Sequence, residues 1–370
     1  MKWVESKEAV GAVDDLLASV GLVHGQRQTR KNAWANGERV PRKQSAGTPR
    51  KVKAKTKSQV DVVRAAAFSK EPWLAHGFST RTGGASRVYK PENVVGDLNL
   101  SWTKEDDVKL IAENRRRFVA AVLDERKNFA EGKPKQMQLI TLRQIHSGVI
   151  HVIKQQKDRQ ISAFGTDAKL ATKDGRAVLR GDGVMTDVPG LLLGIQTADC
   201  IPVMIADRRK KAVAVFHAGW RGTLARIVER GVGRMQMAFG SRVQDLIAAI
   251  GPGIGQSCYS VGENVQHEFE SQFSYAPELF REVYDSDPVK EKYPLLFMTA
   301  RAPGHSNIGP QMHLDLWEAN WRQLMDAGVR EKNITVIAEC TACNPEKYFS
   351  HRGEHGFTGR MLNVIGIREN

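Results

Sequence analysis

The sequence predicts an α/β protein built on mixed β-sheets. Three short apolar runs, at 191–197, 201–207 and 212–218, follow one another closely and have the composition of buried strands. Helical patterns occur elsewhere in the chain, but they do not alternate with the strands one for one. Strict βαβ alternation is typical of a fully parallel sheet, so its absence favours a mixed sheet over a Rossmann domain.

The N-terminal region differs in composition from the rest of the chain. Residues 1–60 carry 13 Lys and Arg against 5 Asp and Glu, whereas the other residues carry 42 against 36. Apart from a short amphipathic helix predicted within 1–23, this region has almost no apolar periodicity. We predict a mostly disordered basic extension over 1–60, more typical of a solvated tail than of a nucleic-acid-binding arm.

The folded domain is predicted to begin near Ala65 and to continue to residue 370. Residues 75–86 have the pattern of a strand that enters a glycine turn. The segment that starts at Thr103 resembles a capping box and predicts the start of a helix. The β-branched residues of 139–153 predict one β segment.

After the three apolar runs, Thr223 predicts the cap of a helix that ends near Met237. Residues 246–251 predict a strand that ends at a Gly-Pro-Gly turn. Helical patterns at 262–282 and 313–327 precede a late strand at 334–339.

Composition argues against several classes of protein. No stretch approaches the roughly 18 apolar residues that a membrane helix needs. Acidic residues within 1–23 do not fit a secretory signal, which has a basic start and an apolar core. Four cysteines are too few and too irregular for a disulfide framework. We therefore predict a cytoplasmic protein with no membrane partner. The nearly equal numbers of basic and acidic residues after residue 60 argue against a nucleic-acid partner.

Three residues at the ends of apolar runs form a candidate metal site: His146, Cys200 and His217. Strand ends are where an α/β sheet exposes functional groups. Two imidazoles and one thiolate are a zinc ligand set that leaves a fourth position for water, whose pKa zinc lowers to about 7. The same trio also fits a Cys–His nucleophile pair or a blue-copper set. Spacing alone does not decide between them.

The motifs around these residues resemble a widespread family once labelled "multicopper polyphenol oxidase" or laccase-domain proteins, and later described as purine nucleoside phosphorylases. The resemblance covers roughly residues 65–370. The matching segments are HGFSTRTGGAS (76–86), LRQIHSG (142–148), DGVMTD (182–187), GIQTADCIPVMIAD (194–207), AVFHAGWRGT (214–223), IGPGIGQSCYSVG (250–262), HLDLW (313–317) and CTACNPEKYFSHRGEHGFTGR (340–360). The resemblance implies a single catalytic domain with an α/β/β/α layered arrangement. Ten histidines without an HxH pair argue against laccase chemistry.

The resemblance further implies one zinc ion on His146, Cys200 and His217, with inorganic phosphate as co-substrate. It implies phosphorolysis of adenosine, inosine, guanosine and methylthioadenosine, and hydrolytic deamination of adenosine. Small-molecule purine nucleosides are thus the expected partners, and the choice between monomer and homodimer stays open. The family also includes peptidoglycan editing factors, so amide hydrolysis of a cell-wall precursor at the same site is an alternative.

Two aspartates are candidates for the proton relay that deamination needs. Asp199 stands beside the cysteine ligand, and Asp182 is equally suitable. The alternative for Asp199 is an orienting role in a turn.

Three arginines are candidates for binding phosphate: Arg81, Arg221 and Arg352. A planar guanidinium holds phosphate through two hydrogen bonds. A structural salt bridge is the alternative for each arginine. Asn99 is a candidate for contact with ribose or base, or for capping a turn.

Cys340 and Cys343 form a CxxC pair that is followed by His351 and His355. This order imitates a zinc finger, but the central gap is shorter than the usual one of about twelve residues. The family pattern places this segment on the substrate side, so a second metal here is the less favoured interpretation. Cys258 is predicted to be a small buried residue.

Overall fold

The computed structural model describes residues 59–89, 96–123, 137–156, 160–164, 169–172, 175–283 and 311–369. The basic extension predicted over 1–60, with its short helix, therefore lies almost entirely outside the described residues. The first strand lies at Val62–Val63, slightly before the predicted start of folded sequence. No helix in the described ranges is long and apolar enough to cross a membrane.

The first of three sheets has five strands. Only β3 runs parallel to its neighbour β7, while the other pairs are antiparallel. The sheet is thus mixed, as predicted. In spatial order the strands are β1 (Val62–Val63), β2 (Leu74–Ser79), β15 (Met361–Ile367), β7 (Leu191–Thr197) and β3 (Gln138–Thr141).

The second sheet has seven strands, and it is also mixed. Its parallel pairs are β10 with β14 and β4 with β6. In spatial order the strands are β14 (Ile334–Val336), β10 (Leu246–Ile250), β8 (Ile201–Asp207), β9 (Ala212–Ala218), β6 (Gly183–Thr186), β4 (Ile150–Gln155) and β5 (Ile161–Ala163). A small third sheet consists of β11 (Ser260–Val261), β13 (Gln311–Leu314) and β12 (Phe280–Val283).

The two larger sheets pack face to face. Leu193 and Ile365 from the five-stranded sheet share one buried cluster with Met204 and Val215 from the seven-stranded sheet. Because successive side chains of a strand point to opposite faces, nearly continuous apolar runs let each strand contact both this cluster and an outer helical layer.

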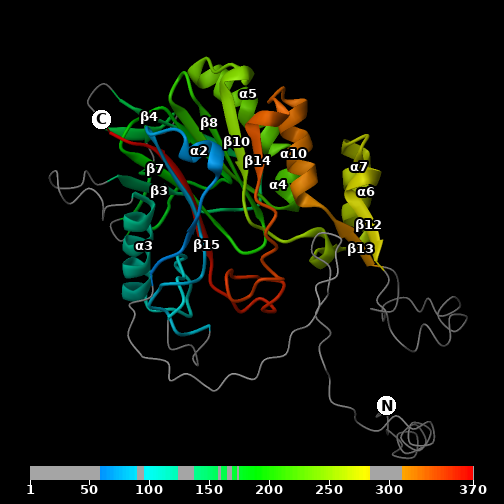
Figure 1. Ribbon diagram of the computed structural model, residues 1–370, viewed down its shortest axis with the longest axis horizontal. Helices are drawn as coiled ribbons and strands as arrows, with labels where there is room; N and C mark the ends of the chain where they lie inside the picture. The colour runs from blue at the N-terminus through cyan, green and yellow to red at the C-terminus, as the bar shows by residue number, and fades with distance from the viewer. Residues whose placement is uncertain are drawn as a thin grey trace, which may run out of the picture. The chain divides into compact units, whose positions relative to one another are not determined.

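Helices cover the outer face of each sheet. Helix α3 (Val108–Leu123) packs its apolar side on the five-stranded sheet. Helices α5 (Ile227–Phe239) and α10 (Leu316–Asp326) pack on the other side, against the seven-stranded sheet (Figure 1). The α/β/β/α arrangement that the family resemblance implies is therefore confirmed.

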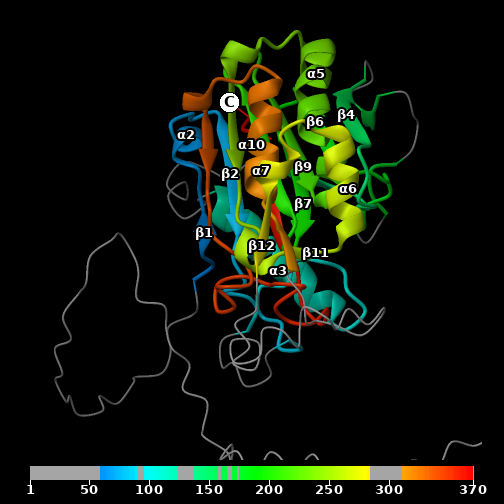
Figure 2. The ribbon, with the colours of Figure 1, turned by 90° about the vertical axis from the view of Figure 1, so that its right-hand side faces the viewer.

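The remaining helices are short, and some of them lie near the third sheet. Figure 2 shows α6 and α7 together with α10 on the face turned toward the viewer. The short helices are α2 (Ala66–Ser69), α4 (Trp220–Leu224), α6 (Glu263–Gln272) and α7 (Ala276–Leu279), with 3₁₀ turns η2 (Val243–Asp245), η3 (Gln256–Cys258) and η4 (Glu331–Asn333).

The three apolar runs coincide with β7, β8 and β9 to the residue. Helix starts were predicted less well. Helix α3 begins at Val108, where the Asp107 carboxylate accepts a hydrogen bond from the Lys109 N–H, and not at Thr103. Thr223 lies inside α4 rather than capping a helix. The β segment predicted over 139–153 divides into β3 and β4, and the loop between them carries His146.

Candidate metal centre

The β3–β4 loop, the start of β8 and the end of β9 bring His146, Cys200 and His217 together. Cys200 immediately precedes β8, and His217 lies in the neighbouring strand β9, opposite Pro202. The ligand atoms of the three side chains all lie within 4.8 Å of one another. The two imidazole rings meet edge to face, with centroids 4.9 Å apart. One site therefore collects two nitrogens and one sulfur.

Asp182 orients the ring of His217 and holds the backbone of His146. Its fully buried carboxylate accepts a hydrogen bond from Nδ1 of His217 at 2.8 Å and from the His146 N–H at 3.0 Å. Since Nδ1 of His217 is engaged, Nε2 is the ring nitrogen left for a metal. A carboxylate paired with a ligating histidine is a common supporting contact at metal sites.

The Asp182 carboxylate is ionised at neutral pH. Burial alone would raise its pKa, but hydrogen bonds from His217 and Ser147 lower that pKa to about 2. The Ser147 N–H and Oγ both donate to Oδ2, at 2.6 and 2.8 Å. The carboxylate is thus available as an acceptor at any pH at which the protein is expected to work.

His146 adopts a left-handed backbone conformation, with φ of 56°. This conformation is uncommon for a residue with a side chain and carries strain. The loop compensates, because the N–H groups of Ile145, His146 and Ser147 all point at the Asp182 carboxylate. A concave set of backbone N–H groups around an anion is a stabilising arrangement.

Cys200 and His217 shift each other's protonation. Burial alone would raise the pKa of the Cys200 thiol, but the charge of His217 and hydrogen bonds from both imidazoles lower it to about 6. Burial alone would lower the pKa of His217, but the charge of Cys200 and the hydrogen bond to Asp182 raise it to about 9. The cysteine is therefore a thiolate, the form that binds metals.

The residues present fit a zinc ion. Two imidazoles and a thiolate match a three-ligand catalytic zinc site with a fourth position open. Gly219 leaves room for the sulfur: a Cβ at this position would lie 2.8 Å from Cys200 Sγ and 3.5 Å from Cδ2 of His146. Any other residue would place its Cβ against the donor set.

Asp199, which stands beside Cys200 at the start of β8, is hydrogen-bonded to residues 340–360, here called the C-terminal segment. Its Oδ1 accepts hydrogen bonds from Thr341 Oγ1 and Ser350 Oγ, both at 2.7 Å, and Oδ2 accepts the Arg352 N–H at 2.6 Å. The residue is buried and has a left-handed φ of 91°. These contacts favour the orienting role for Asp199 over the proton relay.

Two of the three candidate arginines lie near the centre. Arg352 donates to Ser260 Oγ and to its carbonyl oxygen, and its guanidinium lies over the ring of Tyr259. Arg221 is exposed and stacks on Trp220, with 4.3 Å between its Cζ and the ring centroid. The charges of Arg352, Arg221 and Cys200 all act on the Tyr259 hydroxyl, which places both cations in the surroundings of the centre.

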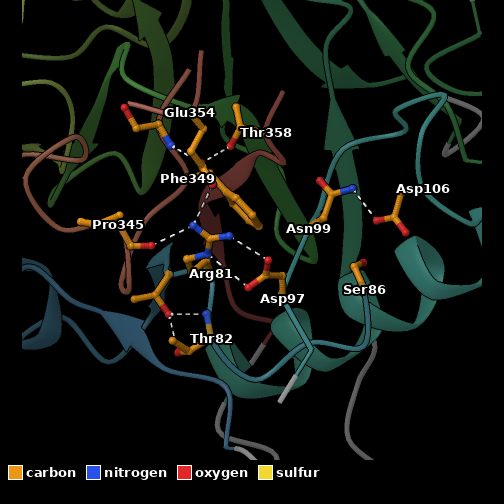
Figure 3. A network of polar contacts seen from close by, with 12 residues as sticks. Arg81, Thr82, Ser86, Asp97, Asn99, Asp106, Pro345, Phe349, Glu354 and Thr358 are labelled. Atoms are coloured by element: carbon orange, nitrogen blue, oxygen red, sulfur yellow. Dashed lines mark hydrogen bonds and ion pairs between the residues drawn. The ribbon is translucent and has the colours of Figure 1, made fainter. Parts of the chain in front are cut away.

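The third arginine, Arg81, has a different environment (Figure 3). It is buried and makes two hydrogen bonds to Asp97, at 3.1 and 2.8 Å. Its remaining Nη donates to the Pro345 carbonyl and to Glu354, at 2.8 and 3.0 Å. The guanidinium also lies 4.6 Å from the ring centroid of Phe349. This environment favours a structural salt bridge for Arg81.

Asn99 is also buried, in the same region of the structure (Figure 3). Its amide donates to Asp106 at 2.8 Å, and its Oδ1 accepts the N–H groups of Ser101 and Arg360. Its amide oxygen thus links the 99–101 turn to the end of the C-terminal segment. The contacts favour the turn-capping role for Asn99.

Sequence reasoning did not single out Tyr259, Ser147 or Gly219. Burial raises the pKa of the Tyr259 hydroxyl, and the charge of Cys200 raises it further, while Arg352 and Arg221 act in the opposite direction. All three residues lie inside or beside the quoted family motifs. The signal that could have drawn attention to them is their closeness in sequence to Cys258, His146 and His217.

The fold and the site together define a class of protein: a layered α/β domain with one His₂Cys centre at the strand ends. The chain belongs to the family described as multi-copper polyphenol oxidoreductase laccase, whose pattern it matches over residues 75–368.

Similar proteins carry names from purine metabolism. Purine nucleoside phosphorylase YlmD from Geobacillus stearothermophilus is 31% identical over 297 residues, which is 79% of this chain and 90% of that protein. Adenosine deaminase RL5 from an unknown prokaryotic organism is 32% identical over 227 residues, which is 61% of this chain and 74% of that protein. The crystal structure of the Geobacillus protein aligns with a TM-score of 0.60 at 28% identity, over 82% of this chain and 94% of that one.

Proposed function

We propose that this chain is a zinc-dependent purine nucleoside enzyme. It would catalyse phosphorolysis of adenosine, inosine, guanosine and methylthioadenosine, and hydrolytic deamination of adenosine. The observation that carries the proposal is the convergence of His146, Cys200 and His217 on one point, with Asp182 behind them. The names of the relatives support it, since they include both a purine nucleoside phosphorylase and an adenosine deaminase.

The three ligands and Asp182 would perform distinct tasks. His146, Cys200 and His217 would hold the zinc ion. When bound, zinc supplies a Lewis acid that brings the pKa of water to about 7 and so makes hydroxide available at neutral pH. Asp182 keeps Nδ1 of His217 protonated, so that Nε2 faces the ligand position. Asp182 and Asp199 act as positioning residues, because their oxygens are already engaged by hydrogen bonds.

Phosphorolysis requires cations that hold phosphate and stabilise the charge that develops as the glycosidic bond breaks. Arg221 and Arg352 are the residues that we propose for inorganic phosphate, the co-substrate. Arg221 is exposed and has its guanidinium stacked on an aromatic ring, which leaves its N–H edges available. Arg352 is held by its backbone to Asp199, beside the cysteine ligand.

The test uses purified, zinc-loaded protein with adenosine, in the presence and absence of phosphate, followed by chromatographic separation of the products. We expect adenine only when phosphate is present, and inosine in both conditions. His146→Ala and Cys200→Ala should abolish both products. His151→Ala is the matched control, because His151 lies on β4 and contacts the Arg180 carbonyl instead of the centre.

If neither adenine nor inosine forms at any phosphate concentration, the nucleoside proposal fails. A nucleotide-linked muropeptide would then be the substrate to test, because amide hydrolysis also needs water activated opposite an electrophilic carbon.

A further inference from the structure

A second group of metal-ligating side chains lies apart from the centre described above. The sulfur atoms of Cys258, Cys340 and Cys343 all lie within 4.8 Å of one another, and those of Cys258 and Cys343 are 3.3 Å apart. The sequence pattern pairs the last two cysteines with histidines and predicts a buried Cys258. In the structure Cys258 is only half-buried. The cluster contains Cys258 together with the CxxC pair, instead of His351 and His355.

Backbone hydrogen bonds position Cys340 within this cysteine cluster. Cys340 and Gly253 form a parallel β-bridge, and the Thr341 N–H donates to the Gly253 carbonyl at 2.9 Å. The Gly255 N–H donates to Cys340 Sγ at 3.2 Å. Backbone N–H groups directed at a cysteine sulfur support the thiolate form, which is the form that binds metals.

The spacing of the sulfurs suits a metal ion. With Zn–S bonds of about 2.3 Å and tetrahedral angles, sulfur ligands lie roughly 3.8 Å apart. The sulfurs of Cys258 and Cys343 are 3.3 Å apart and no pair exceeds 4.8 Å, so small side-chain adjustments bring all three onto one ion. Thiolates select soft, thiophilic cations over magnesium or calcium. Cys343 is exposed, which gives an ion an entry path and leaves a fourth position to water.

We propose that Cys258, Cys340 and Cys343 form a second metal site, which binds one thiophilic cation such as Zn²⁺ and joins the loop at 253–258 to the CxxC turn. The turn continues into the segment whose Ser350 and Arg352 bond to Asp199. The ion would therefore stabilise the segment that presents Arg352, without contributing to the chemistry at Cys200.

The experiment exploits the cysteine count of the chain. The sequence contains four cysteines, so Cys200→Ala leaves only the three of the cluster. We would reduce this full-length variant without oxygen, load it with Zn²⁺, remove free ion and measure zinc content together with the rate of thiol modification. We expect one zinc per chain and protection of all three thiols, both reversed by a chelator. Absence of retained zinc, with thiols that react equally fast with and without the ion, overturns the proposal.

Two further variants in the Cys200→Ala background test the ligand assignment. Cys343→Ser and Cys258→Ser should each lose the retained zinc and the sulfur-to-metal charge-transfer absorption of the Co²⁺ form. Ser257→Ala is the matched control, because its hydroxyl lies 3.8 Å from Cys258 Sγ but is not a ligand. Zinc that survives both cysteine substitutions would place the ion elsewhere and also overturn the proposal. Because Cys200 is absent throughout, the result does not depend on the nucleoside proposal.

Discussion

The carboxylate of Asp182 accepts hydrogen bonds from three consecutive backbone N–H groups and from the ring of His217. These donors come from the β3–β4 loop and from β9, which only the folded sheet brings together. The sequence supplied the three candidate ligands through their motifs, but it left Asp182 as a possible proton relay. The reason is that hydrogen-bond partners distant in sequence leave no local pattern.

Replacing Asp182 by Asn should weaken zinc binding by about 10–100-fold, because the amide nitrogen cannot accept hydrogen bonds from His217 and the loop. The measurement is competition with a chelator of known affinity. Asp187→Asn is the control, since Asp187 pairs with Lys154 away from the centre. An unchanged zinc affinity in Asp182→Asn would mean that the histidines keep their orientation without the carboxylate.

Gly219→Ala should also reduce zinc affinity, because the new methyl group would lie 2.8 Å from Cys200 Sγ. The thiolate would have to move away from the two imidazoles. Gly233→Ala in helix α5 is the matched control: its Cβ would meet no atom within 4 Å. Alanine there should stabilise the fold by about 0.5–1 kcal/mol. Chelator competition and thermal unfolding of both variants separate the two effects, and equal zinc affinity in both would contradict the steric argument.

At the scale of elements, the strands were easier to predict than the helices. Strands β7, β8 and β9 lie between two packed layers, so they are apolar on both faces and have sharp boundaries in the sequence. Helix starts depend on which side chain actually caps the first turn. Thr103 resembles a cap, but its hydroxyl bonds to Tyr89 and the helix begins later.

The Arg81 network joins separate elements, because it links the end of β2 to Asp97 and to the C-terminal segment through Pro345 and Glu354. Arg81→Met should destabilise the fold by about 3–5 kcal/mol, since it leaves the buried Asp97 carboxylate without its partner. Chemical denaturation measures the effect. Arg116→Met is the control, because the Arg116 side chain is 72% exposed and its loss should change stability little. Equal stability of the two variants would show that the buried pair contributes little.

At the scale of the whole molecule, one buried histidine should make stability depend on pH. His76 lies on β2, and its Nε2 accepts the Ala65 N–H. Burial, assisted by the charge of Arg64, lowers the pKa of His76 from 6.5 to about 4. Between pH 6.5 and about pH 4, His76 is therefore protonated in the unfolded chain but stays neutral in the folded chain.

This difference has a defined sign. The stability contribution of neutral His76 is complete above pH 6.5 and is lost as the pH falls toward 4, to a total of about 3 kcal/mol. Denaturation curves between pH 7.5 and 4.5 should show this loss. His76→Gln lacks the titrating group, so its stability should fall less steeply over the same range, whatever its stability at pH 7.5. Parallel pH profiles for both proteins would assign the effect to other groups.

Strand β15 lies between β2 and β7 in the middle of the five-stranded sheet, although it is formed by residues 361–367. During synthesis on a ribosome, β2 and β7 emerge long before the strand that separates them. The edges of β2 and β7 that face β15 have no native partner until residues 361–367 leave the exit tunnel. The bonds from Asp199 to Ser350 and Arg352 form at the same late stage. A nascent chain that stops before Ser350 therefore lacks both the central strand of this sheet and the segment that bonds to Asp199, beside Cys200.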